Sequence, residues 1–308
     1  MRIGIMAAGA VGGYVGARLA AAGHDVVFFA RGAHLDAMRR NGLKVESPAG
    51  DLHLKPVTVT DDPSSVAPVD IVIFAVKLWD TERAGAQIKP IVTRDTRVIT
   101  LQNGVDSVER LATILGPESV VGGTAVIGTV IGKPGVITHS SDFALFRCGR
   151  IDGKPDAKLA AFAAAAKAAG LDMTLSDTMQ RDIWQKFVIL VGLSGATAMT
   201  RMPLGAVLAD DDTRSMFRNL LEETNAVGRA AGVDLAADFA EDRFRFAQKM
   251  HYDMKASMLH DLERGNKLEL DWLAGRVVAL GREHKIATPM NAGVYAALKL
   301  HRDGESSR

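Results

Sequence analysis

The stretch RIGIMAAGAVGGYVGARLAAAG, residues 2–23, decides the fold of this chain. Its first five residues form a short apolar run typical of a buried strand, and residues 11–22 have the pattern of a helix that ends at Gly23. The turn between them, AAGAVG (residues 7–12), matches the dinucleotide-binding pattern Gly-x-Gly-x-x-Gly except at its first position. We therefore predict a Rossmann-type βα unit at the start of the chain.

The residues of this turn have distinct physical roles in a dinucleotide site. Gly9 would let the backbone approach a pyrophosphate, and Gly12 would let the helix pack closely on the strand. The phosphates would then lie on the free N–H groups of the helix N-terminus, at Ala10 and Val11. Ala7 replaces the first glycine, and alanine is strained there if the position needs a positive φ. The alternative is a tight strand-helix turn of another kind of α/β protein.

The end of the second predicted strand, residues 25–30, indicates which dinucleotide is bound. An NAD site usually has an acidic residue there, which holds the ribose hydroxyls. This strand is followed instead by Arg31, whose guanidinium can bind a 2′-phosphate. We therefore expect NADPH as the cofactor, with an ordinary surface arginine as the alternative interpretation.

The first half of the chain alternates strand and helix patterns, which is typical of a mostly parallel, doubly wound sheet. Besides a helix at residues 158–169, we expect strands at residues 71–76, 97–101, 120–127, 135–138 and 172–175. From about residue 176 helical patterns dominate, at residues 181–191, 213–231, 237–262, 268–284 and 290–302. The predicted architecture is an α/β Rossmann-type NADP-binding domain over residues 1–176 and an all-α substrate domain over residues 177–308, with a frayed tail from residue 303.

The composition argues against several classes of function. The chain has 37 basic and 36 acidic residues and shows no basic stripe of the kind that a phosphate backbone demands, so we expect no nucleic-acid partner, although a local basic pocket stays open. Cys148 is the single cysteine, and no pair of histidines lies at ligand spacing beside a carboxylate, so we expect neither a disulfide nor a metal site. The most apolar stretch, residues 187–198, is too short to cross a bilayer. We therefore expect a cytoplasmic protein with no membrane partner.

Three polar residues occupy positions that suit a functional site. Lys77 and Asn103 each follow a predicted strand, at the edge of the sheet where α/β proteins bind ligands. Lys186 lies in the apolar run IWQKFVIL (residues 183–190), where desolvation would lower its pKa and make it a proton donor near neutral pH. Taken singly, the first two are equally compatible with ordinary loop residues, and Lys186 with a lysine that extends to solvent.

Together these residues resemble the ketopantoate reductase (2-dehydropantoate 2-reductase) family, over nearly the whole chain. The resemblance rests on the Gly9–Gly12 turn, Arg31, Val76-Lys77, Gln102-Asn103-Gly104, Trp184-Gln185-Lys186, residues 257–271 (SMLHDLERGNKLELD), Gly275 and residues 287–291 (ATPMN). The run from 257 to 271 is its most specific part. The resemblance implies NADPH-dependent reduction of a 2-oxo acid, 2-dehydropantoate, to pantoate in pantothenate biosynthesis.

The resemblance also implies roles for individual residues. Lys186 would donate a proton to the carbonyl oxygen, which becomes negative when a hydride reaches the carbonyl carbon. Glu269 would lie beside the lysine and help to hold the substrate hydroxyl and the cofactor. Asn103 would contact the substrate and the nicotinamide ribose, and Lys77 would help to bind the cofactor. Ser257 would bind the substrate carboxylate.

Two leucines depart from the family pattern. The positions four and eight residues after the lysine are commonly polar and share its helix face, but here they are Leu190 and Ser194. Ser194 can bind the substrate by a hydrogen bond, whereas Leu190 cannot, and Leu204 replaces an asparagine of some members.

Three hypotheses therefore stay open. The chain is a reductase of 2-dehydropantoate, a reductase of a more apolar 2-oxo acid, or an NADP-binding sensor without catalytic activity. Its long helices would also allow a homodimer.

Overall fold

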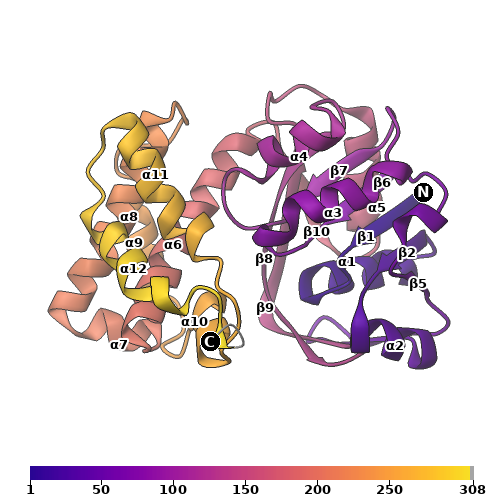
Figure 1. The fold of residues 1–308 in the computed structure, drawn as a ribbon, viewed down its shortest axis with the longest axis horizontal. Coiled ribbons are helices and arrows are strands. Elements are labelled where there is room, and N and C mark those ends of the chain that lie inside the picture. Colours follow the sequence, from indigo (N-terminus) through magenta and orange to yellow (C-terminus); the bar gives the residue numbers. More distant parts are fainter. Residues whose placement is uncertain (306–308) are drawn as a thin grey trace. The chain divides into compact units, whose positions relative to one another are not determined.

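The computed structural model describes residues 1–305, and the chain divides into two compact units, Met1–Gln180 and Arg181–Arg308 (Figure 1). The first unit is built on a sheet with the strands β1 (Arg2–Met6), β2 (Asp25–Phe29), β3 (Leu43–Glu46), β4 (Leu52–Leu54), β5 (Thr58–Thr60), β6 (Ile71–Phe74), β7 (Arg97–Thr100), β8 (Val120–Lys133), β9 (Val136–Gly149) and β10 (Asp172–Leu175). Its helices are α1 (Ala10–Ala21), α2 (Gly32–Asn41), α3 (Thr81–Ile88), α4 (Ser107–Leu115) and α5 (Ala157–Ala168), with short 3-10 turns η1 (Pro63–Ser65), η2 (Leu78–Asp80) and η3 (Lys89–Ile91).

The strands of this sheet follow the order β4-β3-β9-β8-β7-β6-β1-β2-β5, and β10 pairs with β9. Neighbours from β8 through β1 to β5 are parallel, whereas the pairs β8–β9 and β3–β4 are antiparallel. The chain leaves β1 toward β2 on one side and later returns to β6 on the other, so the winding direction reverses between β1 and β6. Ligands of open α/β sheets bind outside the carboxyl ends of the strands at such a switch point.

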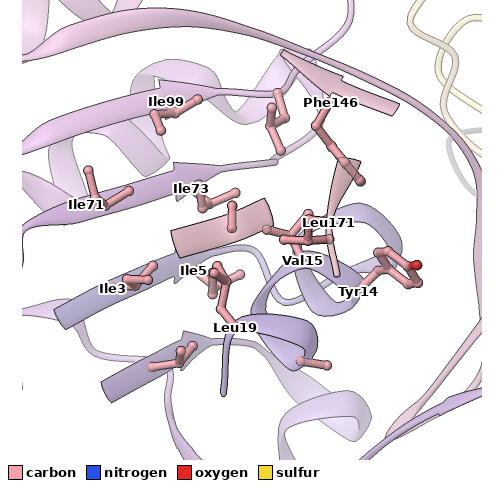
Figure 2. Close-up of a cluster of buried hydrophobic side chains, with 14 of the residues drawn as sticks. Ile3, Ile5, Tyr14, Val15, Leu19, Ile71, Ile73, Ile99, Phe146 and Leu171 are labelled. Atoms are coloured by element: carbon pink, nitrogen blue, oxygen red, sulfur yellow. The ribbon is translucent and has the colours of Figure 1, made fainter. Parts of the chain in front are cut away.

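The central strands are buried on both faces, as expected of parallel strands that are covered by helices on both sides. On one face the isoleucines of β1, β6 and β7 pack with α1, as Figure 2 shows. On the other face Val72 and Phe74 form a second core with Ile88 of α3 and Leu111 of α4. The alternation of side chains along β6 thus divides the unit into two cores that hold the strand ends rigidly.

The predicted fold class, a mostly parallel Rossmann-type sheet followed by an all-α region, is confirmed. The predicted strands at residues 120–127 and 135–138 were too short, because β8 and β9 each run for 14 residues and form one long antiparallel hairpin. Register shifts after Ile127 and Ile131 break the period-two pattern that would have shown its length. Helices α2 to α4 and strands β3 to β5 were not predicted; they are short elements, and the strands have only three or four residues each.

Helices make up the second half of the chain. They are α6 (Met179–Thr200), α7 (Leu204–Ala209), α8 (Asp211–Ala230), α9 (Phe239–Ala247), α10 (Ser257–Glu263), α11 (Ala274–His284) and α12 (Pro289–Leu298), with 3-10 turns η4 (Leu270–Trp272) and η5 (Lys299–His301). The predicted single helix over residues 237–262 was wrong, because α9 and α10 are separate. The carbonyl oxygens of Tyr252 and Met254, between these helices, accept hydrogen bonds from the backbone N–H groups of Gly205 and Leu204. Tertiary hydrogen bonds therefore replace the helical ones in this segment.

By length and composition α6 could cross a membrane, but 61% of its apolar window is buried inside the structure. Its glycines explain part of this burial: a Cβ at Gly192 would meet Leu221 of α8, and one at Gly195 would meet Leu220 and Val294. Close approach of α6 to its neighbours in the helical unit is typical of a core helix.

The first three residues of the predicted frayed tail, 303–305, are ordered. The backbone N–H of Glu305 donates to the carbonyl oxygen of Gly265 at 2.9 Å, so residues 303–305 are held in place. Residues 306–308 of the predicted frayed tail lie outside the described part of the chain.

The turn after β1 carries backbone strain at the position where the glycine is missing. Ala7 has φ 70°, in the left-handed region that costs a residue with a Cβ on the order of 1 kcal/mol. A Cβ at Gly12 would overlap the Ala7 carbonyl oxygen, so the helix start tolerates only glycine there. The concern that Ala7 needs a positive φ is thus confirmed.

Replacing Ala7 by glycine should relieve this strain. We expect Ala7→Gly to raise the free energy of unfolding by about 0.5 to 1 kcal/mol in urea titrations followed by circular dichroism. Ala22→Gly is the matched control, because Ala22 has an ordinary φ of −82° and is exposed. A loss of stability in Ala7→Gly as large as in the control would contradict the strain argument.

Candidate active site

The turn between β1 and α1 has the geometry of a pyrophosphate site. Apart from its two chain neighbours, no residue has an atom within 4 Å of a Cβ built at Gly9, so the space beside this residue is open. The N-terminus of α1 has no side-chain cap and no acidic residue in its first turn, which leaves its N–H groups available to an anion. A Cβ at Gly16 would overlap the ring of Phe28, so this glycine, which the sequence analysis did not consider, also keeps α1 close to the sheet.

His34 of α2 connects this turn to the β8–β9 hairpin. Its Nδ1 accepts a hydrogen bond from the Gly135 N–H at 3.1 Å, and its Nε2 lies 2.8 Å from the Ala8 carbonyl oxygen. Because Nδ1 must be unprotonated to accept, the neutral tautomer that donates from Nε2 satisfies both contacts. Burial lowers the pKa of His34, opposed by its bond to Ala8, and so favours this neutral form. No sequence pattern indicates this role, because it depends on contacts between distant segments.

Arg31 follows β2 and lies at the edge of a shallow hollow that is open to solvent. The hollow is lined by the ends of β1 and β2, by Val76 after β6, and by the start of α3. Arg31 Nη2 donates to Asp80 Oδ2 at 3.0 Å, and Arg83 Nη2 donates to Asp80 Oδ1 at 2.8 Å. Arg31, which is predicted to bind the 2′-phosphate, thus shares the carboxylate of Asp80 with Arg83. No sequence pattern indicated this contact.

Lys77 and Asn103 lie in the loops after β6 and β7, two strands that are neighbours in the sheet. Lys77 is exposed and its ammonium lies 5.6 Å from the centre of the Trp79 ring. Asn103 is half-buried and precedes Gly104, whose φ of 83° turns the chain toward α4. The sheet therefore brings both predicted site residues to the edge where the β1 turn also lies.

A buried hydrogen-bond network fixes these two loops to each other. Gln102 Nε2 donates to the Val76 carbonyl oxygen at 3.1 Å and to the Thr81 hydroxyl at 2.8 Å. The Thr100 hydroxyl donates to Gln102 Oε1 at 3.2 Å, and the Thr81 hydroxyl donates to the Leu78 carbonyl oxygen at 2.8 Å. Gln102 directly precedes Asn103 in the chain, and its side chain binds Val76, which directly precedes Lys77. It therefore connects the two loops.

In the helical unit, Lys186 lies in the second turn of α6. At 100° per residue it faces away from Gly195, which packs against α8 and α12. The side chain keeps some exposed surface, but the surroundings of its ammonium are dense enough to desolvate it. Desolvation lowers the pKa of Lys186 to about 8, opposed by the charge of Glu269.

Glu269 is the charged partner of this lysine. Its side chain is buried, with 5% of its surface exposed, at the start of the 3-10 turn η4. Its carboxylate favours the ammonium form of Lys186, so the two charges stabilise each other away from water. The structure therefore brings the two predicted catalytic residues together.

The other predicted substrate residues lie in different environments. Ser194 is fully buried, and no described group forms a hydrogen bond with its hydroxyl. An orphaned buried hydroxyl is consistent with a ligand that completes its hydrogen bonding. Ser257 is exposed at the first position of α10. Leu190 is partly exposed one turn after Lys186, whereas Leu204 is buried and belongs to the core.

One motif of the family resemblance is structural. Pro289 is the first residue of α12, and the Glu223 side chain accepts hydrogen bonds from the backbone N–H groups of Met290 and Asn291 at 2.8 and 2.9 Å. Glu223 also accepts from the Asn291 side chain at 2.8 Å. The segment ATPMN therefore begins α12, and Glu223 of α8 caps the start of this helix.

Family models of known proteins match both units of the chain. The family model for Ketopantoate reductase PanE/ApbA matches residues 3–152, and the model for its C-terminal domain matches residues 178–302. The chain belongs to the ketopantoate reductase family. Members of this family are nicotinamide-dependent oxidoreductases, and the chain is such an enzyme.

Individual relatives cover the whole length of the chain. The 2-dehydropantoate 2-reductase of Mesorhizobium japonicum is 31% identical, with 97% of each chain covered. The uncharacterized oxidoreductase YkpB of Bacillus subtilis (strain 168) is 29% identical over 98% of this chain and 99% of its own. The crystal structure of 2-dehydropantoate 2-reductase from Geobacter metallireducens GS-15 superposes with a TM-score of 0.91, at 32% identity over 97% of this chain and 99% of that one.

The residues present fit a nicotinamide dinucleotide. The open space at Gly9, the uncapped start of α1 and the hollow beside Arg31 lie along the carboxyl ends of β1 and β2. A pyrophosphate on the helix N-terminus and an adenosine ribose in the hollow would satisfy these groups.

Within residues 1–305, no cluster of three histidine, cysteine, aspartate or glutamate residues has the arrangement of a metal site.

Removing Gln102 should loosen the two loops that it connects. We expect Gln102→Ala to lower the free energy of unfolding by about 2 kcal/mol or more, because it leaves buried polar groups without partners. Chemical denaturation measures this loss, and Gln87→Ala, at an exposed position of α3, should change stability by only a few tenths of a kcal/mol. Equal stability of the two variants would show that the network does not hold the loops.

Proposed function

We propose that this enzyme reduces 2-dehydropantoate to pantoate with NADPH, and that Lys186 is the proton donor. The observation that carries the proposal is the pairing of the half-buried Lys186 with the buried Glu269, with a lysine pKa of about 8. An acid is most effective when its pKa lies near the working pH, and an ordinary lysine is far too basic for that. The family membership and the named relatives support the substrate.

The cofactor would be held by the first unit. The backbone N–H groups at Gly9, Ala10, Val11 and Gly12 would bind the pyrophosphate at the N-terminus of α1. Arg31 would bind the 2′-phosphate, since its guanidinium lies at the hollow beside β2 and no acidic residue ends that strand. Lys77 and Asn103 would hold other parts of the dinucleotide from the loops after β6 and β7.

The bound nicotinamide would supply the hydride to the carbonyl carbon of the 2-oxo acid. Lys186, protonated below its pKa of about 8, would donate its proton to the carbonyl oxygen as negative charge develops there. Glu269 would keep the ammonium in place and contact the substrate hydroxyl. Asn103, Ser194 and Ser257 would orient the substrate, the last through its carboxylate.

One observation favours a second candidate, the reduction of a more apolar 2-oxo acid by the same lysine. Leu190 is partly exposed one turn from Lys186, so an apolar surface adjoins the ammonium. A hydroxyl of the substrate placed against this leucine would lose its hydrogen bonds, which penalises recognition of hydroxylated acids.

We also propose that the enzyme is cytoplasmic and that two copies of it pair through their long helices to form a homodimer.

The choice of substrate is tested by steady-state oxidation of NADPH with 2-dehydropantoate and a panel of branched and aromatic 2-oxo acids. We expect kcat/KM for 2-dehydropantoate to exceed that for unhydroxylated acids by about tenfold or more, since each satisfied hydroxyl contributes on this scale. Leu190→Asn should widen the difference by adding a polar group beside the lysine. Higher kcat/KM for the apolar acids would assign the enzyme to the second candidate.

The role of the lysine is tested by Lys186→Ala. We expect kcat to fall by about two orders of magnitude or more, with the Kd of NADPH little changed. In the unaltered enzyme kcat/KM should fall as pH rises through about 8, because the amine loses the proton that it must donate. Gln185→Ala, on the same helix, is the control. An activity that rises through this pH range, or an unchanged kcat in Lys186→Ala, would contradict the role.

A further inference from the structure

Two guanidinium groups share one carboxylate beside the hollow at the end of β2. Asp80 accepts from Arg31 through Oδ2 at 3.0 Å and from Arg83 through Oδ1 at 2.8 Å. The arginines come from separate parts of the sequence, one at the start of α2 and the other in the first turn of α3. All three side chains line the hollow. The bridge therefore belongs to the surface that a ribose phosphate would meet.

Helix capping does not explain the position of Asp80. The residue precedes α3, but its side chain forms no cap hydrogen bond with that helix. Its carboxylate instead forms ion pairs with the two arginines, and its side chain is 20% exposed, against 60% for Arg31 and 57% for Arg83. The carboxylate thus lies beneath two guanidinium groups that extend toward solvent.

Each guanidinium keeps donors for a further anion. An arginine has five N–H donors, and each of these arginines uses one nitrogen for Asp80. A phosphate dianion accepts several charge-assisted hydrogen bonds, and two arginines can bind it from two directions. The second acidic residue of the hollow, Asp61, already forms an ion pair with Arg39 at 3.4 Å. Arg31 and Arg83 are therefore the cations that can face the phosphate.

We propose that Arg83 is a second ligand of the 2′-phosphate of NADPH, and that Asp80 limits NADPH affinity by competing with this phosphate for both arginines. The proposal rests on the proposed use of NADPH. With the phosphate bound, two negative groups face each other across the same guanidinium groups, and their repulsion weakens binding. The opposing effect, in which Asp80 holds the arginines in place, is small because exposed ion pairs restrain their side chains weakly. NADH has no 2′-phosphate and avoids this competition.

The test compares the Kd values of NADPH and NADH for the full-length enzyme and four variants by fluorescence titration at low ionic strength. Arg83→Gln should weaken NADPH binding by about five- to twentyfold and leave NADH within about twofold. Asp80→Asn should tighten NADPH binding by about three- to tenfold without tightening NADH, because it removes the competing charge and keeps the shape. Arg31→Gln tests the proposed cofactor itself, and Arg40→Gln, an exposed residue of α2, is the control for a lost positive charge.

The outcomes separate this inference from the proposed function. If the unaltered enzyme binds NADH as tightly as NADPH, and Arg31→Gln affects both equally, the use of NADPH is wrong. If the enzyme prefers NADPH and Arg31→Gln removes that preference, while Arg83→Gln matches the Arg40→Gln control, only the role of Arg83 is overturned. Weaker NADPH binding in Asp80→Asn would overturn the competition. Titrations with 2′,5′-ADP and 5′-AMP should repeat the pattern, since these probes lack the nicotinamide.

Discussion

The close approach of α1 to the end of β1 is the constraint on which the cofactor side of this enzyme depends. The helix begins so near the strand that a Cβ at Gly12 would overlap the Ala7 carbonyl oxygen, and one at Gly16 would overlap the Phe28 ring. Directly after β1, Ala7 has a positive φ, and the space beside Gly9 at the uncapped start of α1 is open. The proposed pyrophosphate site would thus depend on backbone packing more than on any side chain.

Buried polar contacts then set the loops around that turn. Gln102 connects the segments that carry Lys77 and Asn103, and His34 connects the turn itself to the β8–β9 hairpin. Each of these side chains satisfies backbone groups that burial would otherwise leave without partners. A few hydrogen bonds therefore hold these loops in position. Hydride transfer requires a cofactor that is held precisely, and supporting hydrogen bonds of this kind fix the residues that would hold it.

The proposed role of Lys186 as a proton donor depends on a balance between two opposing effects on its pKa. Desolvation by burial lowers the pKa of Lys186, and the charge of the buried Glu269 carboxylate opposes this shift. Desolvation alone would favour the neutral amine, which has no proton to donate, and the ion pair alone would keep the lysine too basic. The combination leaves an acid with a pKa of about 8. Leu190, one turn further along α6, adds a partly exposed apolar side chain on the same helix face as the lysine.

Features that depend on neighbouring residues were predictable from the sequence: the β1 turn, the strands that precede Lys77 and Asn103, the apolar surroundings of Lys186, and the change to helices in the second half. Their signals are local, since strand, turn and helix patterns repeat within a few residues. Only the tertiary structure decided that Asp80 joins Arg31 to Arg83, that His34 contacts Gly135, and that residues 237–262 break into two helices. The physical reason is that hydrogen bonds and ion pairs between distant segments depend on sheet order and register, which no local pattern records.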